Sequence, residues 1–150
     1  MSEEKYRFQV NLGGMIEILS DHLYSSPDVY IRELLQNGAD AITAKRKWNA
    51  ALGIADSAAS KDDGCIVLEI EEGQKLIFTD NGLGLTEEEI HQFLAIIGES
   101  SKRELADGEL RSDYIGRFGI GLLSCFMVSD EIRMLTRSCK SEDSPIMARN

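Results

Sequence analysis

One stretch of the chain decides most of its fold: Tyr30-Ile31-Arg32-Glu33-Leu34-Leu35-Gln36-Asn37-Gly38-Ala39-Asp40. Shortly before it stands Ser26-Pro27, a good N-cap followed by a proline at the first helical position, so a long helix is predicted from there to about Trp48. Steps of four and three residues place Glu33, Asn37 and Asp40 on one face of this helix. Such a polar stripe is either a solvated face or a binding surface, on which the amide holds a hydrated cation and Glu33 is left free as a base.

A second polar cluster, Asp80-Asn81-Gly82-Leu83-Gly84, comes after two apolar runs, residues 65–70 and 75–79. The two runs predict a β-hairpin. The cluster is either a tight turn, because Asp, Asn and Gly dominate turns, or a carboxylate fixed at a strand end. In the second case the glycines let a flat ligand approach the backbone. Since Asp80 only accepts hydrogen bonds, it prefers a ring with an exocyclic amine, such as adenine, to guanine.

A third cluster is rich in glycine and opens a predicted short helix: Gly116-Arg117-Phe118-Gly119-Ile120-Gly121. It is either a loop with flexible joints or an anion site, because the N–H groups at a helix start attract phosphate and glycines let it come close. The cluster lacks the Lys-Ser/Thr ending of a Walker P-loop. Its spacing also differs from that of the dinucleotide-binding pattern.

The rest of the chain predicts a mixed α/β fold, with helices covering one face of a sheet. The further elements are an amphipathic helix over residues 8–24, a loop over 49–64, a helix from the capping box Thr86-Glu87-Glu88-Glu89 to about Ile97, a polar segment over 98–114 and a strand over 131–137.

Composition limits the class of protein. The chain of 150 residues fits one domain. Its net charge of −10 would repel phosphate backbones, so we expect no nucleic-acid partner. Three cysteines without CxxC spacing and two histidines offer little to a zinc site and favour reduced thiols. The acidic amino terminus is unlike a signal peptide, and no stretch reaches the roughly 20 apolar residues of a membrane span. We therefore expect a soluble, cytoplasmic protein with no membrane partner.

Taken together and in this order, the three clusters resemble those of the GHKL (Bergerat-fold) ATPase superfamily. The flanking residues 23–37, residues 115–121 with Ser124, and Val128-Ser129-Asp130 resemble the heat shock protein 90 chaperones, above all the bacterial HtpG type. The resemblance runs from about Phe8 to Arg137. It implies an α+β fold, a two-layer sandwich with a mixed, mostly antiparallel sheet and helices on one face. It also implies ATP and Mg²⁺ as cofactors.

The resemblance implies a role for each matching residue. Glu33 is expected to be the general base, and Asn37 to hold the magnesium ion. Asp80 is expected to bind the adenine amino group, while Asp40 orders water beside it. The other residues expected to line the nucleotide site are Ala41, Gly84 and Leu85 at the base and Gly116, Phe118, Gly119, Ile120 and Gly121 at the phosphates. Residues 98–114 are expected to form a lid over ATP. These roles match the needs of hydrolysis, which requires a positioned base and charge neutralisation.

Some residues depart from the family's pattern. Asn81 replaces the usual Thr and is more like MutL proteins, Leu85 replaces the usual Met, and residues 94–99 differ from the usual lid hinge. A lysine expected near Glu99 appears only at Lys102.

Residues 1–150 are expected to be a nucleotide-binding domain truncated at its C-terminal end. The family's further strands beyond Arg137 are expected to be absent before Asn150, as are its middle and dimerisation domains. The expected partners are ATP or ADP, unfolded client proteins bound by the full-length chaperone, and a second copy bound through the absent domains. Hydrolysis by this chain alone is expected to be slow or absent. The alternatives are a non-hydrolysing nucleotide sensor and a MutL-like ATPase.

Overall fold

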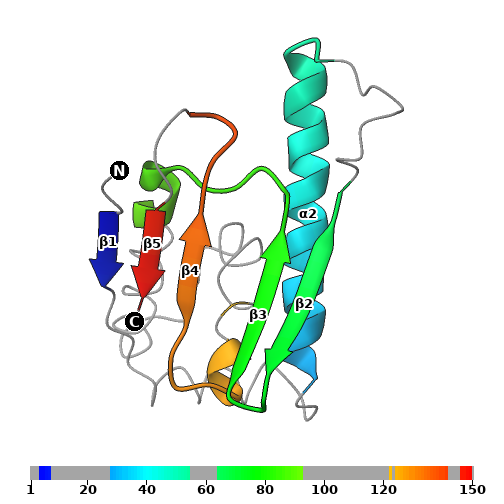
Figure 1. Ribbon diagram of the computed structural model, residues 1–150. Helices are drawn as coiled ribbons and strands as arrows, with labels where there is room; N and C mark the ends of the chain where they lie inside the picture. Colours follow the sequence, from blue (N-terminus) through cyan, green and yellow to red (C-terminus); the bar gives the residue numbers. More distant parts are fainter. Residues whose placement is uncertain are drawn as a thin grey trace, which may run out of the picture.

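The computed structural model describes residues 4–7, 28–54, 64–92, 122, 124–141 and 146–149. In these ranges a long helix and a hairpin stand beside a three-stranded sheet (Figure 1). The elements in chain order are β1 (Glu4–Arg7), α2 (Val29–Ala51), β2 (Ile66–Glu71), β3 (Lys75–Asp80), the short 3₁₀ helix η2 (Ser124–Met127), β4 (Arg133–Thr136) and β5 (Ile146–Arg149). Residues 87–92 are also helical. The predicted helix over residues 8–24 and the polar segment over 98–114 lie outside the described residues.

Helix α2 confirms the long helix predicted from the opening stretch, with a correction at each end. Its N-cap is Asp28 and not Ser26: the Asp28 carbonyl accepts the first helical hydrogen bonds, from the amides of Ile31 and Arg32 at 3.2 and 3.3 Å. The helix ends at Ala51, three residues beyond the predicted end, where the Leu52 amide bonds back to the carbonyls of Trp48 and Asn49. The predicted loop over residues 49–64 therefore starts later.

The predicted hairpin is confirmed. Strands β2 and β3 pair antiparallel, with Leu68 opposite Phe78 and Glu71 opposite Lys75. The turn between them places Glu72 and Gly73 in the left-handed region, at φ values of 41° and 70°, and the Gln74 amide donates to the Glu71 carbonyl at 2.9 Å. Glycine adopts this conformation without strain, which explains its place in the turn.

The second sheet has the order β1-β5-β4. β1 runs parallel to β5, and β4 runs antiparallel to it. β4 confirms the strand predicted over residues 131–137. The expectation that no further strand comes between Arg137 and Asn150 is wrong, because β5 occupies residues 146–149 and is the central strand of this sheet. β5 pairs with β1 on one side and with β4 on the other. Its own four residues are too few to show a clear hydrophobic pattern in the sequence.

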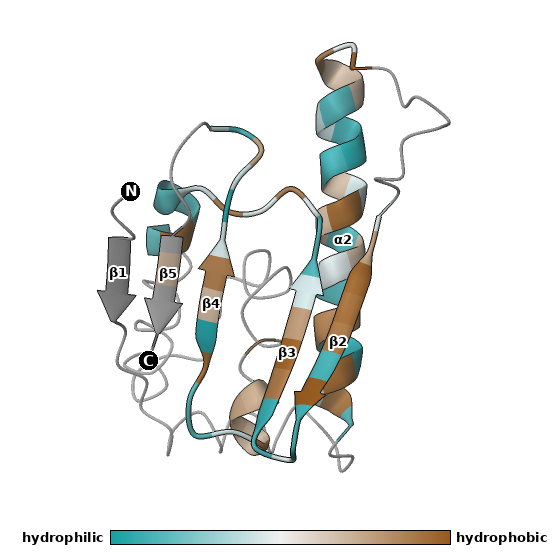
Figure 2. Ribbon diagram, viewed as in Figure 1, coloured by the Kyte–Doolittle hydropathy of each residue, from teal (hydrophilic) through white to brown (hydrophobic). Residues whose placement is uncertain are grey.

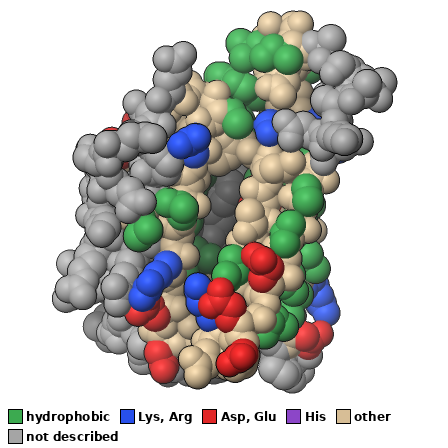
Figure 3. All heavy atoms as spheres, viewed as in Figure 1, with side chains coloured by type: hydrophobic (Ala, Val, Ile, Leu, Met, Phe, Trp, Pro, Cys, Tyr) green, Lys and Arg blue, Asp and Glu red, His purple; other side chains and the backbone are tan. Residues whose placement is uncertain are grey.

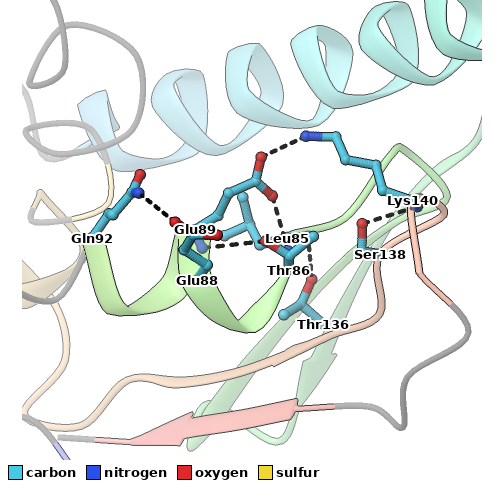
Figure 4. Close-up of polar contacts among 8 residues, drawn as sticks. All are labelled: Leu85, Thr86, Glu88, Glu89, Gln92, Thr136, Ser138 and Lys140. Carbon is cyan, nitrogen blue, oxygen red and sulfur yellow. Dashed lines mark hydrogen bonds and ion pairs between the residues drawn. The ribbon is translucent and has the colours of Figure 1, made fainter.

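Helix α2 packs closely on the hairpin because Gly38 has no side chain. A Cβ atom at Gly38 would lie 3.0 Å from Cδ1 of Ile66 and 3.1 Å from Cζ of Phe78. Figure 2 shows the apolar residues concentrated on β2 and β3, which α2 covers from behind. α2 and the helical residues 87–92 lie on the same side of the strands (Figures 1 and 4). The α+β fold class, with a mixed set of mostly antiparallel strands and helices on one face, is confirmed.

Ile90 and Phe126 are the buried apolar residues of the described part of the chain, with 0% and 9% of their surface exposed. They belong to the helical residues 87–92 and to η2, so these two short elements help to close the core beside the strands. No helix in the described ranges combines the length and the apolar character that crossing a membrane requires.

Candidate functional site

The first part of the candidate site is a stripe along α2. Glu33, Asn37 and Ala41 succeed one another at four-residue steps and are all half-buried. Because residues four apart share a helical face, these three point to the same side of α2. Asp40 lies at the exposed margin, where its Oδ1 accepts a hydrogen bond from Nε2 of Gln36 at 3.0 Å. The structure therefore keeps Glu33 and Asn37 together as the sequence predicts.

The second part is the segment of residues 80–86, here called the Asp80 loop. It leaves the end of β3 and leads to the helical residues 87–92. Asp80 is exposed, and its Oδ1 accepts a hydrogen bond from the Gly82 amide at 2.8 Å. This bond shapes the start of the loop and fixes the carboxylate at the strand end. The turn and the fixed carboxylate, which the sequence offers as alternatives, are thus both present.

Asn81 ties the loop to the start of the hairpin. Its Oδ1 accepts from the Cys65 amide at 2.7 Å, and its own amide donates to the Cys65 carbonyl at 3.2 Å. The asparagine that departs from the family's usual threonine therefore has a structural role here. Its side chain extends the pairing of β2 and β3 by one more residue pair.

The Asp80 loop lies against the α2 stripe. The Leu83 amide donates to the Ala41 carbonyl at 3.0 Å, and Nζ of Lys45 donates to the Asn81 carbonyl at 3.0 Å. A Cβ atom at Gly82 would lie only 2.5 Å from the Cβ of Ala41. The Asp80 loop, which is far from α2 in the sequence, therefore contacts the stripe at Ala41.

The other side of the loop lies against β4 and residues 137–139. The Leu85 amide donates to Oγ1 of Thr136 at 3.0 Å, and the Cys139 amide donates to the Leu83 carbonyl at 2.8 Å. Gly84 has a φ of 70°, and a Cβ atom there would lie 2.0 Å from the Arg137 carbonyl oxygen. Only glycine fits this position, because it adopts a positive φ without strain and has no Cβ atom to clash with the Arg137 carbonyl.

The exit of the loop is held by the predicted capping box (Figure 4). The Thr86 amide donates to Oε2 of Glu89 at 2.9 Å, and the Glu89 amide donates to Oγ1 of Thr86 at 3.2 Å. Nζ of Lys140 binds the other carboxylate oxygen of Glu89. Partial burial raises the pKa of Glu89, but the hydrogen bond and charge of Lys140 and the bonds from Thr86 outweigh it, so this pKa lies below its usual value of 4.5.

Lys45, Thr136 and Lys140 also hold the Asp80 loop or its exit, and none of them is among the residues predicted from the sequence. Each contacts the loop or its exit from a distant part of the chain. No local spacing signals such contacts.

Residues 24–148 match the family described as "Histidine kinase-, DNA gyrase B-, and HSP90-like ATPase". The chain belongs to this family. It is also similar to proteins named "Chaperone protein HtpG". The one from Francisella tularensis subsp. novicida (strain U112) is 30% identical over 96% of this chain and 24% of its own length. Those from Salinispora tropica and Oleidesulfovibrio alaskensis are 32% and 34% identical, over 95% and 90% of this chain and 23% and 22% of their own lengths.

The resemblance to heat shock protein 90 chaperones is confirmed by these relatives, and the sensor and MutL-like alternatives are not favoured. The chain spans about a quarter of the length of the curated relatives it matches.

The predicted phosphate-binding residues of this ATPase domain lie outside the described residues: Gly116, Phe118, Gly119, Ile120 and Gly121. The short helix η2 comes shortly after them in the chain. Its residues Ser124 and Phe126 are buried, and η2 contacts α2 near the N-terminal end of that helix (Figure 1). η2 therefore lies beside the part of α2 that carries Glu33 and Asn37. Figure 3 shows that the visible face is hollowed between β4 and β3.

Two further observations concern the chemistry of the site. In the part of the chain that the structure describes, no three side chains of His, Cys, Asp or Glu are grouped so as to hold a metal ion. The amide oxygen of Asn37 is a hard oxygen ligand of the kind that Mg²⁺ accepts alongside nucleotide phosphates, so the donor present fits the predicted ion.

Burial raises the pKa of the Cys125 thiol to about 11, which keeps it protonated and unreactive at neutral pH.

Proposed function

We propose that residues 1–150 form the ATP-binding and ATP-hydrolysing domain of an HtpG-like chaperone. One observation carries the proposal: the bond from the Leu83 amide to the Ala41 carbonyl, at 3.0 Å, joins the Asp80 loop to the stripe of Glu33 and Asn37. We propose that an acceptor for an adenine amine and a base with an adjacent oxygen ligand thereby share one site. Hydrolysis needs these groups together, because the nucleotide must be fixed at one end and attacked at the other.

In this proposal, each of the predicted site residues has a task. The carboxylate of Asp80 accepts a hydrogen bond from the adenine amine, while Ala41, Gly84 and Leu85 line the base and Asp40 orders water beside it. Asn37 would hold Mg²⁺, which would neutralise charge on the phosphates. Glu33, one helical turn away, takes the proton of the attacking water. We propose that the glycine cluster at residues 116–121 binds the phosphates.

For the whole protein, we propose binding of unfolded clients, a dimer formed through domains beyond this chain, and a cytoplasmic location. The similarity to HtpG supports these assignments. We also propose that this chain alone hydrolyses ATP slowly or not at all, since it spans about a quarter of those relatives.

Calorimetric titration with Mg-ATP, Mg-ADP and Mg-GTP tests the site. We expect adenine nucleotides to bind and GTP to bind at least about tenfold more weakly, because a carboxylate repels the guanine carbonyl. Asp80→Asn should lose most of this affinity. Turnover should depend on Glu33 and not on Asp80 alone. The Glu33→Ala variant of the full-length protein should bind ATP normally and hydrolyse it at least about 100-fold more slowly. Equal binding of GTP, or normal turnover by Glu33→Ala, would contradict the assignments.

A further inference from the structure

The Asp80 loop is held from two sides, and each side contributes a bond that involves a side chain. On the α2 side, the Ala41 carbonyl accepts a bond from the Leu83 amide, and Nζ of Lys45 donates to the Asn81 carbonyl within the loop. On the β4 side, the side chain of Thr136 accepts the bond from the Leu85 amide. Side-chain contacts can be removed by substitution, so the contribution of the β4 side to the loop can be measured.

Thr136 holds the loop where it turns toward the helical residues 87–92. Both Thr136 and Leu85 are half-buried, so water replaces a lost partner of the Leu85 amide only in part. Leu85 is the residue directly after Gly84, where an added Cβ atom would lie 2.0 Å from the Arg137 carbonyl oxygen. The bond to Thr136 therefore fixes the direction in which the chain leaves Gly84.

Lys140 holds the next part of the chain through Glu89. One oxygen of the Glu89 carboxylate accepts from the Thr86 amide, and the other accepts from Nζ of Lys140 (Figure 4). The two side chains are 29% and 34% exposed, less than in the pair of Lys75 with Glu71, at 58% and 60%. The ion pair is thus partly shielded from water, and it joins the exit of the loop to the segment after β4.

The Lys140 segment is itself well anchored. The Lys140 amide donates to Oγ of Ser138 at 3.1 Å, and Ser138 is buried, with 6% of its surface exposed. The neighbouring Cys139 amide donates to the Leu83 carbonyl. β4 and residues 137–140 therefore support the Asp80 loop from Leu83 onward and the start of the helical residues that follow it, as far as Glu89.

We propose that Thr136 and Lys140 are positioning residues for nucleotide binding, which hold the Asp80 loop in the shape that receives the base. The inference rests on the proposed function, because it assigns the base to this loop. Neither side chain needs to touch the nucleotide. When part of the population has the loop in another conformation, the apparent affinity for the nucleotide falls in proportion to the fraction of molecules that can bind it.

The test compares Thr136→Val and Lys140→Met with the unsubstituted protein. We expect each substitution to weaken Mg-ATP binding by about five- to tenfold in calorimetric titration, because one lost hydrogen bond or ion pair shifts the loop population by that order. Hydrogen exchange of the amides of residues 82–86 should speed up, while exchange in the middle of α2 should not change. Thr136→Ser and Lys140→Arg, which keep the hydroxyl and the charge, should restore both readouts.

Two matched variants control for the chemical change itself. Thr43→Val removes an exposed hydroxyl bond to the Ala39 carbonyl within α2, and Lys75→Met breaks the exposed pair with Glu71. Both should bind Mg-ATP as the unsubstituted protein does. Equal loss of affinity in the controls overturns the inference.

The remaining outcomes separate the inference from the proposed function. Unchanged affinity or unchanged exchange in Thr136→Val and Lys140→Met, with an unsubstituted protein that binds Mg-ATP, overturns the inference alone. If the unsubstituted protein is folded but does not bind Mg-ATP, the proposed function and the inference both fall.

Discussion

At the scale of single residues, Gly84 has the tightest surroundings in the Asp80 loop. Its left-handed φ of 70° and the 2.0 Å approach of a Cβ to the Arg137 oxygen make two separate demands. Gly53 shares only the first, since its φ is 69° and nothing lies within 4 Å of its Cβ position. The pair therefore separates backbone strain from steric clash.

We expect Gly53→Ala to lower the free energy of unfolding by about 1 kcal/mol, the usual cost of a non-glycine residue in this conformation. Gly84→Ala should lower it by more than about 3 kcal/mol, because the backbone at Arg137 must also move. Urea unfolding of both variants measures the difference. Similar losses in the two variants would show that the contact with Arg137 relaxes easily.

The sequence supports prediction of site residues only where the chemistry is local. The spacing of Glu33 and Asn37 places them on one helical face, and Asp80 ends a strand, so all three can be singled out. Lys45 and Thr136 cannot, because they reach the loop across 36 and 51 residues of sequence. Asn81 differs from the family's usual residue, but only the structure shows that its side chain binds Cys65.

At the scale of elements, the cap of the helical residues 87–92 depends on pH through Glu89. The pKa of this carboxyl is lower in the folded protein than its usual 4.5, so the unfolded chain binds the proton more readily. The stabilisation is therefore complete above the usual pKa and is lost as pH falls through the lower, folded value.

Comparison with Glu89→Gln measures this dependence, because glutamine keeps the capping bond but not the charge. At pH 7 we expect the unsubstituted protein to be more stable by less than about 1 kcal/mol, as befits a partly exposed pair. The difference should shrink below pH 4.5 in urea unfolding experiments. A difference that stays constant from pH 7 to acid would contradict the role of the charge.

Elements with a strong local pattern are the ones that the sequence predicts. The hairpin has two apolar runs and a turn with glycine, and the capping box has its Thr and Glu at the required spacing. The start of α2 is harder, since Asp28 and Ser26 are both good N-cap types and stand two residues apart. β1 and β5 are missing from the predicted elements. They pair with each other across most of the chain, and no local pattern in the sequence signals that pairing.

At the scale of the whole molecule, the net charge of −10 opposes the approach of an anionic nucleotide. Salt screens this repulsion, since the Debye length falls from about 30 Å at 0.01 M to about 10 Å at 0.1 M. The association rate constant of Mg-ATP should therefore rise about two- to fivefold over that range of NaCl, measured by stopped flow at constant Mg²⁺. A basic nucleotide site would show the opposite trend.

Adenosine provides the control for this measurement. It carries the base without the phosphates, so its association rate constant should not change with salt. A rate constant for Mg-ATP that falls with salt would show that positive charge near the phosphates outweighs the net charge of the chain.

The parallel pair of β1 and β5 also has a consequence for synthesis on the ribosome. Glu4 is opposite Ile146, so β1 has no partner in this sheet until nearly all of the chain in between has been made. At roughly 5–20 residues per second, this delay is on the order of ten seconds. During that time the backbone of β1 is an unpaired strand edge, with which other nascent chains can pair. When several copies of the chain are synthesised close together, mispairing is therefore favoured at residues 4–7. The hairpin is less exposed to such errors, because β2 and β3 are close in sequence and pair locally.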